Sequence, residues 1–184
     1  MTDSRFTYGN IIILYSNHIK GNGTVVPDYV NERIKTCLNV LQRIQNSKPD
    51  SQYISIIIVG YENWGEIIKK CILKSNPGLQ IRIDSKSKTL LDSLKSVIKD
   101  SKKLPNPPFV YVVSSFWHKE IFDLIRPRLK GLKIQFDGSL DHRTVDEISF
   151  ERKKEQPPIG VEDLKNKAKN RALDSLLNYI FPDK

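Results

Sequence analysis

Long apolar runs are missing from this sequence. The longest, residues 11–15 (IIILY), is the length of a strand, whereas about 20 apolar residues are needed to cross a bilayer. Residues 1–6 are polar and lack the basic and then apolar pattern of a signal peptide. We therefore expect a cytoplasmic protein that has no membrane partner.

Cysteine and histidine are scarce. The two cysteines, Cys37 and Cys71, fall in separate helical patterns, so no disulfide framework is indicated and both are expected to be buried apolar thiols. The three histidines, His18, His118 and His142, lack metal-ligand spacing. We therefore expect no metal site.

The common phosphate-binding and catalytic fingerprints are also missing. The two glycines of residues 21–23 (GNG) do not form the dinucleotide motif, because no third glycine opens a helix directly after a strand. The chain has no Gly-Lys-Ser/Thr loop, no nucleophile elbow and no His-Glu-x-x-His sequence. No reaction class is therefore fixed by a motif.

The composition is that of one globular domain with a basic surface. The 184 residues are 39% hydrophobic, which is enough for a single domain, residues 1–184, with a buried core. The formal net charge is +9, and a basic field attracts anionic partners, whether small molecules or nucleic acids. Much of this charge is lysine spread along helix faces, which ordinarily serves solubility.

Short apolar runs rich in β-branched residues alternate with stretches of helical periodicity. Such runs predict strands that are buried on both faces, as in a parallel sheet. The alternation predicts a Rossmann-like α/β domain of three layers around a central, mostly parallel sheet of about five strands. The strands are expected at residues 10–16, 53–59, 80–84, 109–113 and 132–136.

The expected helices lie between and after these strands. Residues 10–136 should form the core of the domain, 137–160 a long polar surface segment, and 161–181 a C-terminal helix. Thr89 is expected to be an N-cap, with Asp92 in a capping-box-like position. Helices are expected at about 28–44, after Gly65, from 89 to 98, from 118 to 125 or 129, and at 161–181.

Polar residues follow the predicted strands at their carboxyl ends, which is the edge where open α/β sheets bind ligands. Each of these loops leads into a helix start, where the N–H groups and the helix dipole favour anions. Arg33 lies one helical turn before Cys37, so its charge either snorkels to the surface or points into a cleft. The candidate ligand-binding residues are Asn17, Arg33, Gly60, Asn63, Thr89, Ser114 and Ser115.

Two residues are candidates for catalysis. A histidine titrates near neutral pH, so His118 is either a general acid or base or a helix residue packed on Trp117. Glu66 lies near a helix start, where the dipole alone also favours a carboxylate. Ser114 and Ser115 offer hydroxyl nucleophiles with His118 as base, but serines at a strand end more often bond to loop backbone groups.

The order and spacing of four blocks resemble the YdcF/SanA/ElyC-like family, a group of Rossmann-like domains of poorly defined function. The first strand leads through a glycine loop to residues 28–34, which place the arginine of the family at Arg33. Residues 56–60 look like the second strand, and Glu66 like the acidic residue at the next helix start. Residues 88–93 are similar to the threonine helix start, at Thr89, and residues 112–118 to the strand exit that ends in the histidine of the family, at His118.

The chain also departs from this family. Tyr61 stands where the family has a second glycine, and Ile121 where it often has an arginine. Leu91 takes the place of an acidic residue, unless the register slips by one so that Asp92 and Ser93 are the counterparts. Asp92 is also a ligand-binding candidate.

The resemblance implies a nucleotide-like or phosphorylated small ligand, with S-adenosylmethionine as a cofactor associated with the family. In that interpretation Arg33 neutralises the charge of the ligand, Thr89 and helix amides hold a phosphate or carboxylate, and His118 transfers a proton. Two alternatives stay open: a nucleic-acid-binding module that uses the basic stretches 86–103 and 165–171, and an inactive relative that serves as a scaffold.

Overall fold

The computed structural model describes residues 9–17, 25–47, 54–87, 90–101, 108–126 and 133–155. These residues form one five-stranded sheet in the order β3-β2-β1-β4-β5, and every pair of neighbouring strands is parallel. The predicted fold class, a three-layer Rossmann-like domain, is confirmed. The strands are β1 (Asn10–Asn17), β2 (Ile54–Gly60), β3 (Gln80–Asp84), β4 (Phe109–Ser115) and β5 (Lys133–Ser139).

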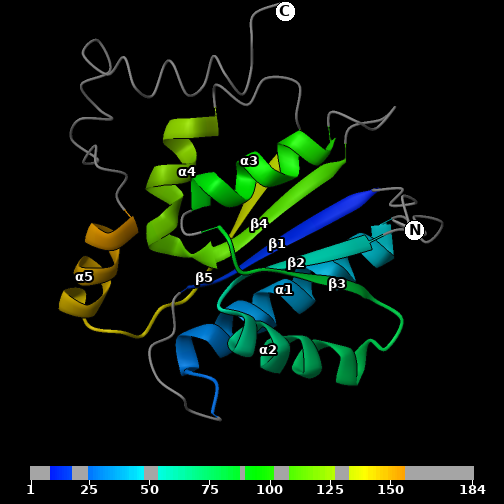
Figure 1. Ribbon diagram of the computed structural model, residues 1–184, viewed down its shortest axis with the longest axis horizontal. Helices are drawn as coiled ribbons and strands as arrows, with labels where there is room; N and C mark the ends of the chain where they lie inside the picture. Colours follow the sequence, from blue (N-terminus) through cyan, green and yellow to red (C-terminus); the bar gives the residue numbers. More distant parts are fainter. Residues whose placement is uncertain are drawn as a thin grey trace, which may run out of the picture.

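Helices cover both faces of the sheet (Figure 1). Helices α1 (Asp28–Ser47) and α2 (Glu62–Ser75) pack on one face, and α3 (Leu90–Ser101) and α4 (Lys119–Ile125) pack on the other. A single 3-10 turn, η1 (Phe116–His118), joins β4 to α4. Helix α5 (Val145–Glu155) stands apart beyond the carboxyl ends of the strands.

Strand β1 forms the centre of the core because its apolar residues serve both faces. Side chains alternate across a strand, so Ile13 and Tyr15 pack toward α3 and α4, while Ile12 and Leu14 pack toward α1 and α2. All four are at most 1% exposed. This double burial explains why the sequence shows a continuous apolar run here and not an alternating one.

The strand order creates a switch point between β1 and β4. The chain runs outward from β1 through β2 to β3, then returns to place β4 on the other side of β1. The helices that follow β1 and β4 therefore leave toward opposite faces of the sheet. In open α/β sheets this is the place where ligands bind, beyond the carboxyl ends of the strands. We call the edge at which the strands end the carboxyl rim.

Two elements differ from the sequence-based expectation near the end of the described chain. Strand β5 continues to Ser139, and helix α5 occupies part of the expected polar surface segment. Thr144 caps α5, since it accepts a hydrogen bond from the backbone N–H of Glu147 and donates its own N–H to the Glu147 carboxylate. The C-terminal helix expected at 161–181 lies outside the described residues.

Helix α2 begins earlier than expected and approaches the sheet closely. It starts at Glu62, so Gly65 lies inside the helix and not before it. A Cβ atom at Gly65 would lie 2.6 Å from Cγ2 of Ile83 on β3, so the absence of a side chain allows the close packing. In the described part of the chain, no helix is both long and apolar enough to cross a membrane.

The two thiols occupy different environments. Cys37 is fully buried under α1, and burial raises the pKa of its thiol to about 12. Cys71 is exposed on α2. The expectation of two buried thiols is therefore correct for Cys37 and wrong for Cys71, which lies on the solvent side of its helix next to the buried position of Ile72.

Candidate functional site

The two serines that end β4 point to opposite faces of the sheet. Ser114 and Ser115 are both completely buried, and neighbouring residues of a strand alternate between faces. Ser114 meets His118 of η1, while Ser115 meets Arg33 of α1. The carboxyl rim at β4 therefore carries polar groups on both sides of the sheet.

Arg33 points inward and not to the surface. Its side chain is 0% exposed. Its Nε and Nη2 donate to Oγ of Ser115 at 3.0 and 2.6 Å, and its Nη1 donates to the backbone oxygen of Tyr15 at 2.9 Å. The guanidinium thus ties α1 to the ends of β1 and β4, and of the two interpretations of Arg33 the inward one is correct.

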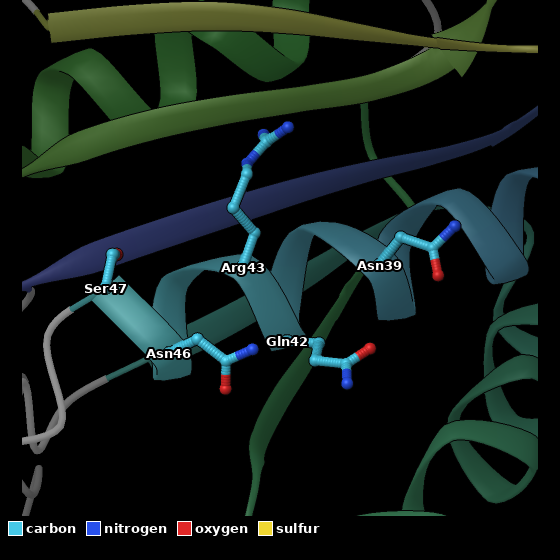
Figure 2. Close-up of a pocket in the computed structure, with 5 residues that line it drawn as sticks. All are labelled: Asn39, Gln42, Arg43, Asn46 and Ser47. Carbon is cyan, nitrogen blue, oxygen red and sulfur yellow. The ribbon is translucent and has the colours of Figure 1, made fainter.

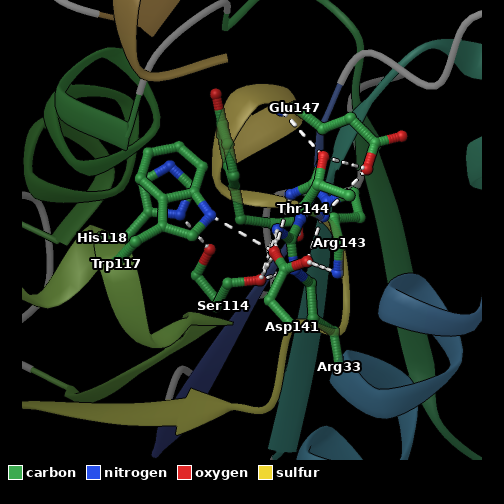
Figure 3. A network of polar contacts seen from close by, with 10 residues as sticks. Arg33, Ser114, Trp117, His118, Asp141, Arg143, Thr144 and Glu147 are labelled. Carbon is green, nitrogen blue, oxygen red and sulfur yellow. Dashed lines mark hydrogen bonds and ion pairs between the residues drawn. The ribbon is translucent and has the colours of Figure 1, made fainter. Parts of the chain in front are cut away.

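Asp141, two residues past the end of β5, is the centre of a polar network (Figure 3). Its Oδ2 accepts hydrogen bonds from Oγ of Ser115 at 2.6 Å and from Nε1 of Trp117 at 3.3 Å. Arg143 forms a two-pronged contact, from Nε to Oδ1 at 2.8 Å and from Nη2 to Oδ2 at 2.6 Å. Nη2 of Arg33 lies 3.7 Å from Oδ2. One carboxylate is therefore shared by two guanidinium groups, a hydroxyl and an indole.

These donors keep Asp141 ionised. Burial alone would raise the pKa of this carboxyl group. The hydrogen bonds from Arg143 and Ser115, together with the charges of Arg143 and Arg33, outweigh burial and hold the pKa of Asp141 well below its usual range. The carboxylate is therefore negatively charged throughout the physiological pH range.

The hydroxyl of Ser115 has its hydrogen-bonding capacity filled. It donates its one proton to Asp141 and accepts two N–H groups from Arg33, and a hydroxyl offers one donor and two lone pairs. Its oxygen is therefore occupied on every side. This arrangement fits a structural bridge between Arg33 and Asp141 better than a nucleophile.

His118 lies on the other face of the sheet in a closed aromatic setting. Its Nδ1 is 2.6 Å from Oγ of Ser114, and its side chain is fully buried. The Trp117 ring stacks on it with centroids 3.5 Å apart, and Tyr15 meets it edge-on at 5.1 Å. A hydroxyl and an imidazole at this distance can exchange a proton, but Trp117 would have to move before a ligand could reach the ring.

Trp117 joins the two halves of the site. Its ring lies on His118, and its N–H points to Asp141 (Figure 3). The structure therefore brings together four of the predicted site residues around the end of β4: Arg33, Ser114, Ser115 and His118.

The other predicted site residues lie elsewhere or outside the described chain. Glu66 is half exposed on α2 and pairs with Lys69 at 3.5 Å, and Asn63 is exposed at the start of the same helix. Within the described ranges, no hydrogen bond or ion pair joins either of them to the network. Asp92 pairs with Lys95 on α3, whereas Thr89 and the side chain of Asn17 lie outside the described residues.

Gly60 ends β2 at the same rim, in a backbone conformation that favours glycine. Its φ is 156°, which L side chains rarely adopt. It is the register partner of Asn17, beyond an irregularity in the pairing of β1 with β2. Next to it, Ser16 is buried and donates to the backbone oxygen of Val59 at 2.8 Å, which fixes the exit of β1 against β2.

Three residues of the network are not predicted by the sequence: Asp141, Arg143 and Tyr29. The guanidinium of Arg143 lies 3.8 Å from the centroid of the Tyr29 ring, and that of Arg33 lies 5.2 Å from it. The signal for Asp141 was present, since it closely follows a strand. The sequence predicts a strand that ends at residue 136, whereas β5 continues to Ser139, so the prediction does not place Asp141 next to a strand end.

A surface hollow of about 610 Å³ is lined by residues of one helix (Figure 2). Its lining side chains come from the C-terminal half of α1, and among them Arg43 lies over Tyr111, near the amino end of β4. The hollow therefore lies toward the opposite end of the strands. The lining residues are Asn39, Gln42, Arg43, Asn46 and Ser47.

Metal binding finds no support in the described residues, where no group of three His, Cys, Asp or Glu side chains comes together.

Comparisons with protein-family models, with curated proteins and with solved structures give no match. The resemblance to the YdcF/SanA/ElyC-like family therefore stays a prediction.

Proposed function

We propose that this protein binds an anionic small molecule, phosphorylated or nucleotide-like, at the carboxyl rim between β1 and β4. The observation that carries the proposal is the network around Asp141, which joins α1, β4 and the chain after β5 at the switch point. Two arginines, a hydroxyl and an indole N–H lie there together, and these are groups that recognise phosphate or carboxylate oxygens.

Arg143 is the cation through which a ligand would first be held. Side-chain exposure rises from 0% for Arg33 through 5% for Asp141 to 12% for Arg143, so Arg143 is the outermost of the three. Its stacking on Tyr29 orients the guanidinium, and a pre-oriented guanidinium binds an anion with a smaller loss of conformational entropy.

Ser114 and His118, at the same rim, would supply proton transfer if the protein also catalyses a reaction of the bound molecule. This pair can hold or move a proton between Oγ and Nδ1. Since the imidazole is buried under Trp117, proton transfer to a ligand requires that indole to swing aside. The binding proposal does not depend on this step.

The proposal is tested by thermal shift with inorganic phosphate, sugar phosphates, nucleotides and S-adenosylmethionine, followed by calorimetry on any hit. A ligand at 100 times its Kd should stabilise the protein by about 2.7 kcal/mol. Arg143→Ala should abolish the effect. Arg43→Ala is the matched control, because Arg43 also pairs with an aspartate but does so with Asp137, away from the network.

The proposal fails if none of these compounds stabilises the protein, or if both arginine variants lose binding equally. A basic nucleic-acid-binding module would give a different result. In that case an oligonucleotide would bind with an affinity that falls steeply with salt, and the single Arg143→Ala change would weaken it only slightly.

A further inference from the structure

Among the described residues, every polar group that forms a hydrogen bond with the Asp141 side chain is a donor. Arg143 donates from its backbone N–H, Nε and Nη2, Ser115 from its hydroxyl and Trp117 from its indole, and Arg33 adds a charge at 3.7 Å. Such a convergence of donors is the structure of an oxyanion-binding site. Here the oxyanion is a side chain of the protein itself.

An independent observation at the same place points to an incompletely filled polar site. Ser139 is 2% exposed, and its hydroxyl finds no hydrogen-bond partner in the part of the chain that the structure describes. Ser139 is the register partner of Ser115 in the pairing of β4 with β5, so both side chains point to the face of the sheet that carries α1. Buried hydroxyl groups are ordinarily bonded, and an oxygen brought within hydrogen-bond distance would satisfy Ser139.

We propose that Asp141 is an internal stand-in for the anionic ligand: its carboxylate occupies an oxyanion site, and a phosphate or carboxylate group binds by displacing it. This inference rests on the proposed function, and it adds how the site is kept closed. The ligand oxygens take over the donors of Arg143, Ser115 and Trp117, and Ser139 supplies one more hydroxyl.

The position of Asp141 in the fold allows this exchange. It lies in the non-helical stretch between β5 and α5, and among the described residues neither hydrophobic core cluster contains a residue of α5. The chain after β5 can therefore shift without opening the core. Competition by Asp141 lowers the apparent affinity of the wild-type protein for its ligand, because only the displaced state is competent to bind.

The test removes the internal carboxylate and supplies an anion in solution. In Asp141→Ala, inorganic phosphate should raise the melting temperature with a midpoint concentration at least tenfold lower than in the wild-type protein. Asp137→Ala is the control, because Asp137 also lies on the β5 side and accepts two hydrogen bonds from an α1 arginine. It should behave like the wild type, and sodium chloride at equal ionic strength should not replace phosphate.

The inference is overturned if phosphate stabilises Asp141→Ala no more than Asp137→Ala. If the alanine variant does not fold, Asp141→Asn and Asp137→Asn replace the pair, and the same difference is required. Acetate and adenosine monophosphate titrated in parallel show whether a carboxylate or a phosphate on a larger molecule is preferred. A ligand that binds the wild type while phosphate fails to stabilise the Asp141 variant would leave the proposed function standing and remove this inference alone.

Discussion

Replacing Arg33 by methionine is the sharpest test of the network. The substitution keeps an unbranched, apolar stem in the space under α1 and removes the guanidinium. It strips two N–H groups from Oγ of Ser115 and one from the carbonyl of Tyr15, and it takes a positive charge away from Asp141. Arg33, Ser115 and Tyr15 are at most 1% exposed, and the side chain of Asp141 is 5% exposed, so water has little access to these groups.

The expected cost follows from these losses. Removing one partner of a buried, hydrogen-bonded ion pair costs about 3–5 kcal/mol. The pairing of Asp141 with Arg143 survives, which keeps the estimate within that range. A chain of this size loses roughly 2–4 °C in Tm for each kcal/mol, so the Tm should fall by roughly 6–20 °C.

The measurement is urea unfolding followed by circular dichroism, with Arg43→Met as the control. Arg43 lies on the same helix and also pairs with an aspartate, but its side chain is 52% exposed. Such a surface pair contributes about 0–1 kcal/mol. If the two variants lose the same stability at equal denaturant slopes, Arg33 is not a buried anchor and the reasoning about the network is wrong.

Three further predictions concern other parts of the molecule. The stability difference between the wild type and Asp141→Asn should be constant above about pH 5 and shrink as the pH falls below about 4. A carboxylate with a lowered pKa contributes its full stabilisation above the pKa of the unfolded chain, about 3.9, and loses it as the pH falls toward the lower pKa of the folded state. At pH 8 a thiol reagent should label one cysteine rapidly, Cys71, and should reach Cys37 only on unfolding, so rapid labelling of both would contradict the structure. Gly138→Ala should cost about 1–3 kcal/mol because a Cβ there overlaps the Phe116 ring, and Phe116→Ala in the same chain should remove most of that cost in a double-mutant cycle.

The fold could be predicted because its signals are local. Residues 11–15 are all apolar, so the strand they form has an apolar side chain on each face. This pattern is typical of a strand that lies between two layers of helices. Helix α5 is harder to predict because residues 145–147 at its start are exposed and no apolar stripe marks the helix. Its one local signal was the capping box that Thr144 forms with Glu147.

The site could be predicted only in part because its geometry depends on contacts between distant segments. Arg33 and Ser115 meet across 82 residues of chain, and nothing in the local pattern around Arg33 shows whether it turns inward. Ser114, Ser115 and His118 could be predicted because they follow a predicted strand, and open α/β sheets bind ligands beyond the carboxyl ends of their strands. Asp141 could not be predicted in the same way, because the apolar run predicts a strand end at residue 136 whereas β5 ends at Ser139.

The two arginines of α1 have a mechanical consequence. Arg33 and Arg43 are ten residues apart, which is about 15 Å along the helix axis. Arg33 forms hydrogen bonds to β1 and β4, and Arg43 forms hydrogen bonds to β5. The helix is therefore attached to the sheet at two points along its length. A rocking motion of α1 would have to break the three buried hydrogen bonds of Arg33. We therefore expect any opening of the carboxyl rim to occur in residues 140–144, which lead from β5 into α5. Distance labels placed along α1 should report no change while this segment moves.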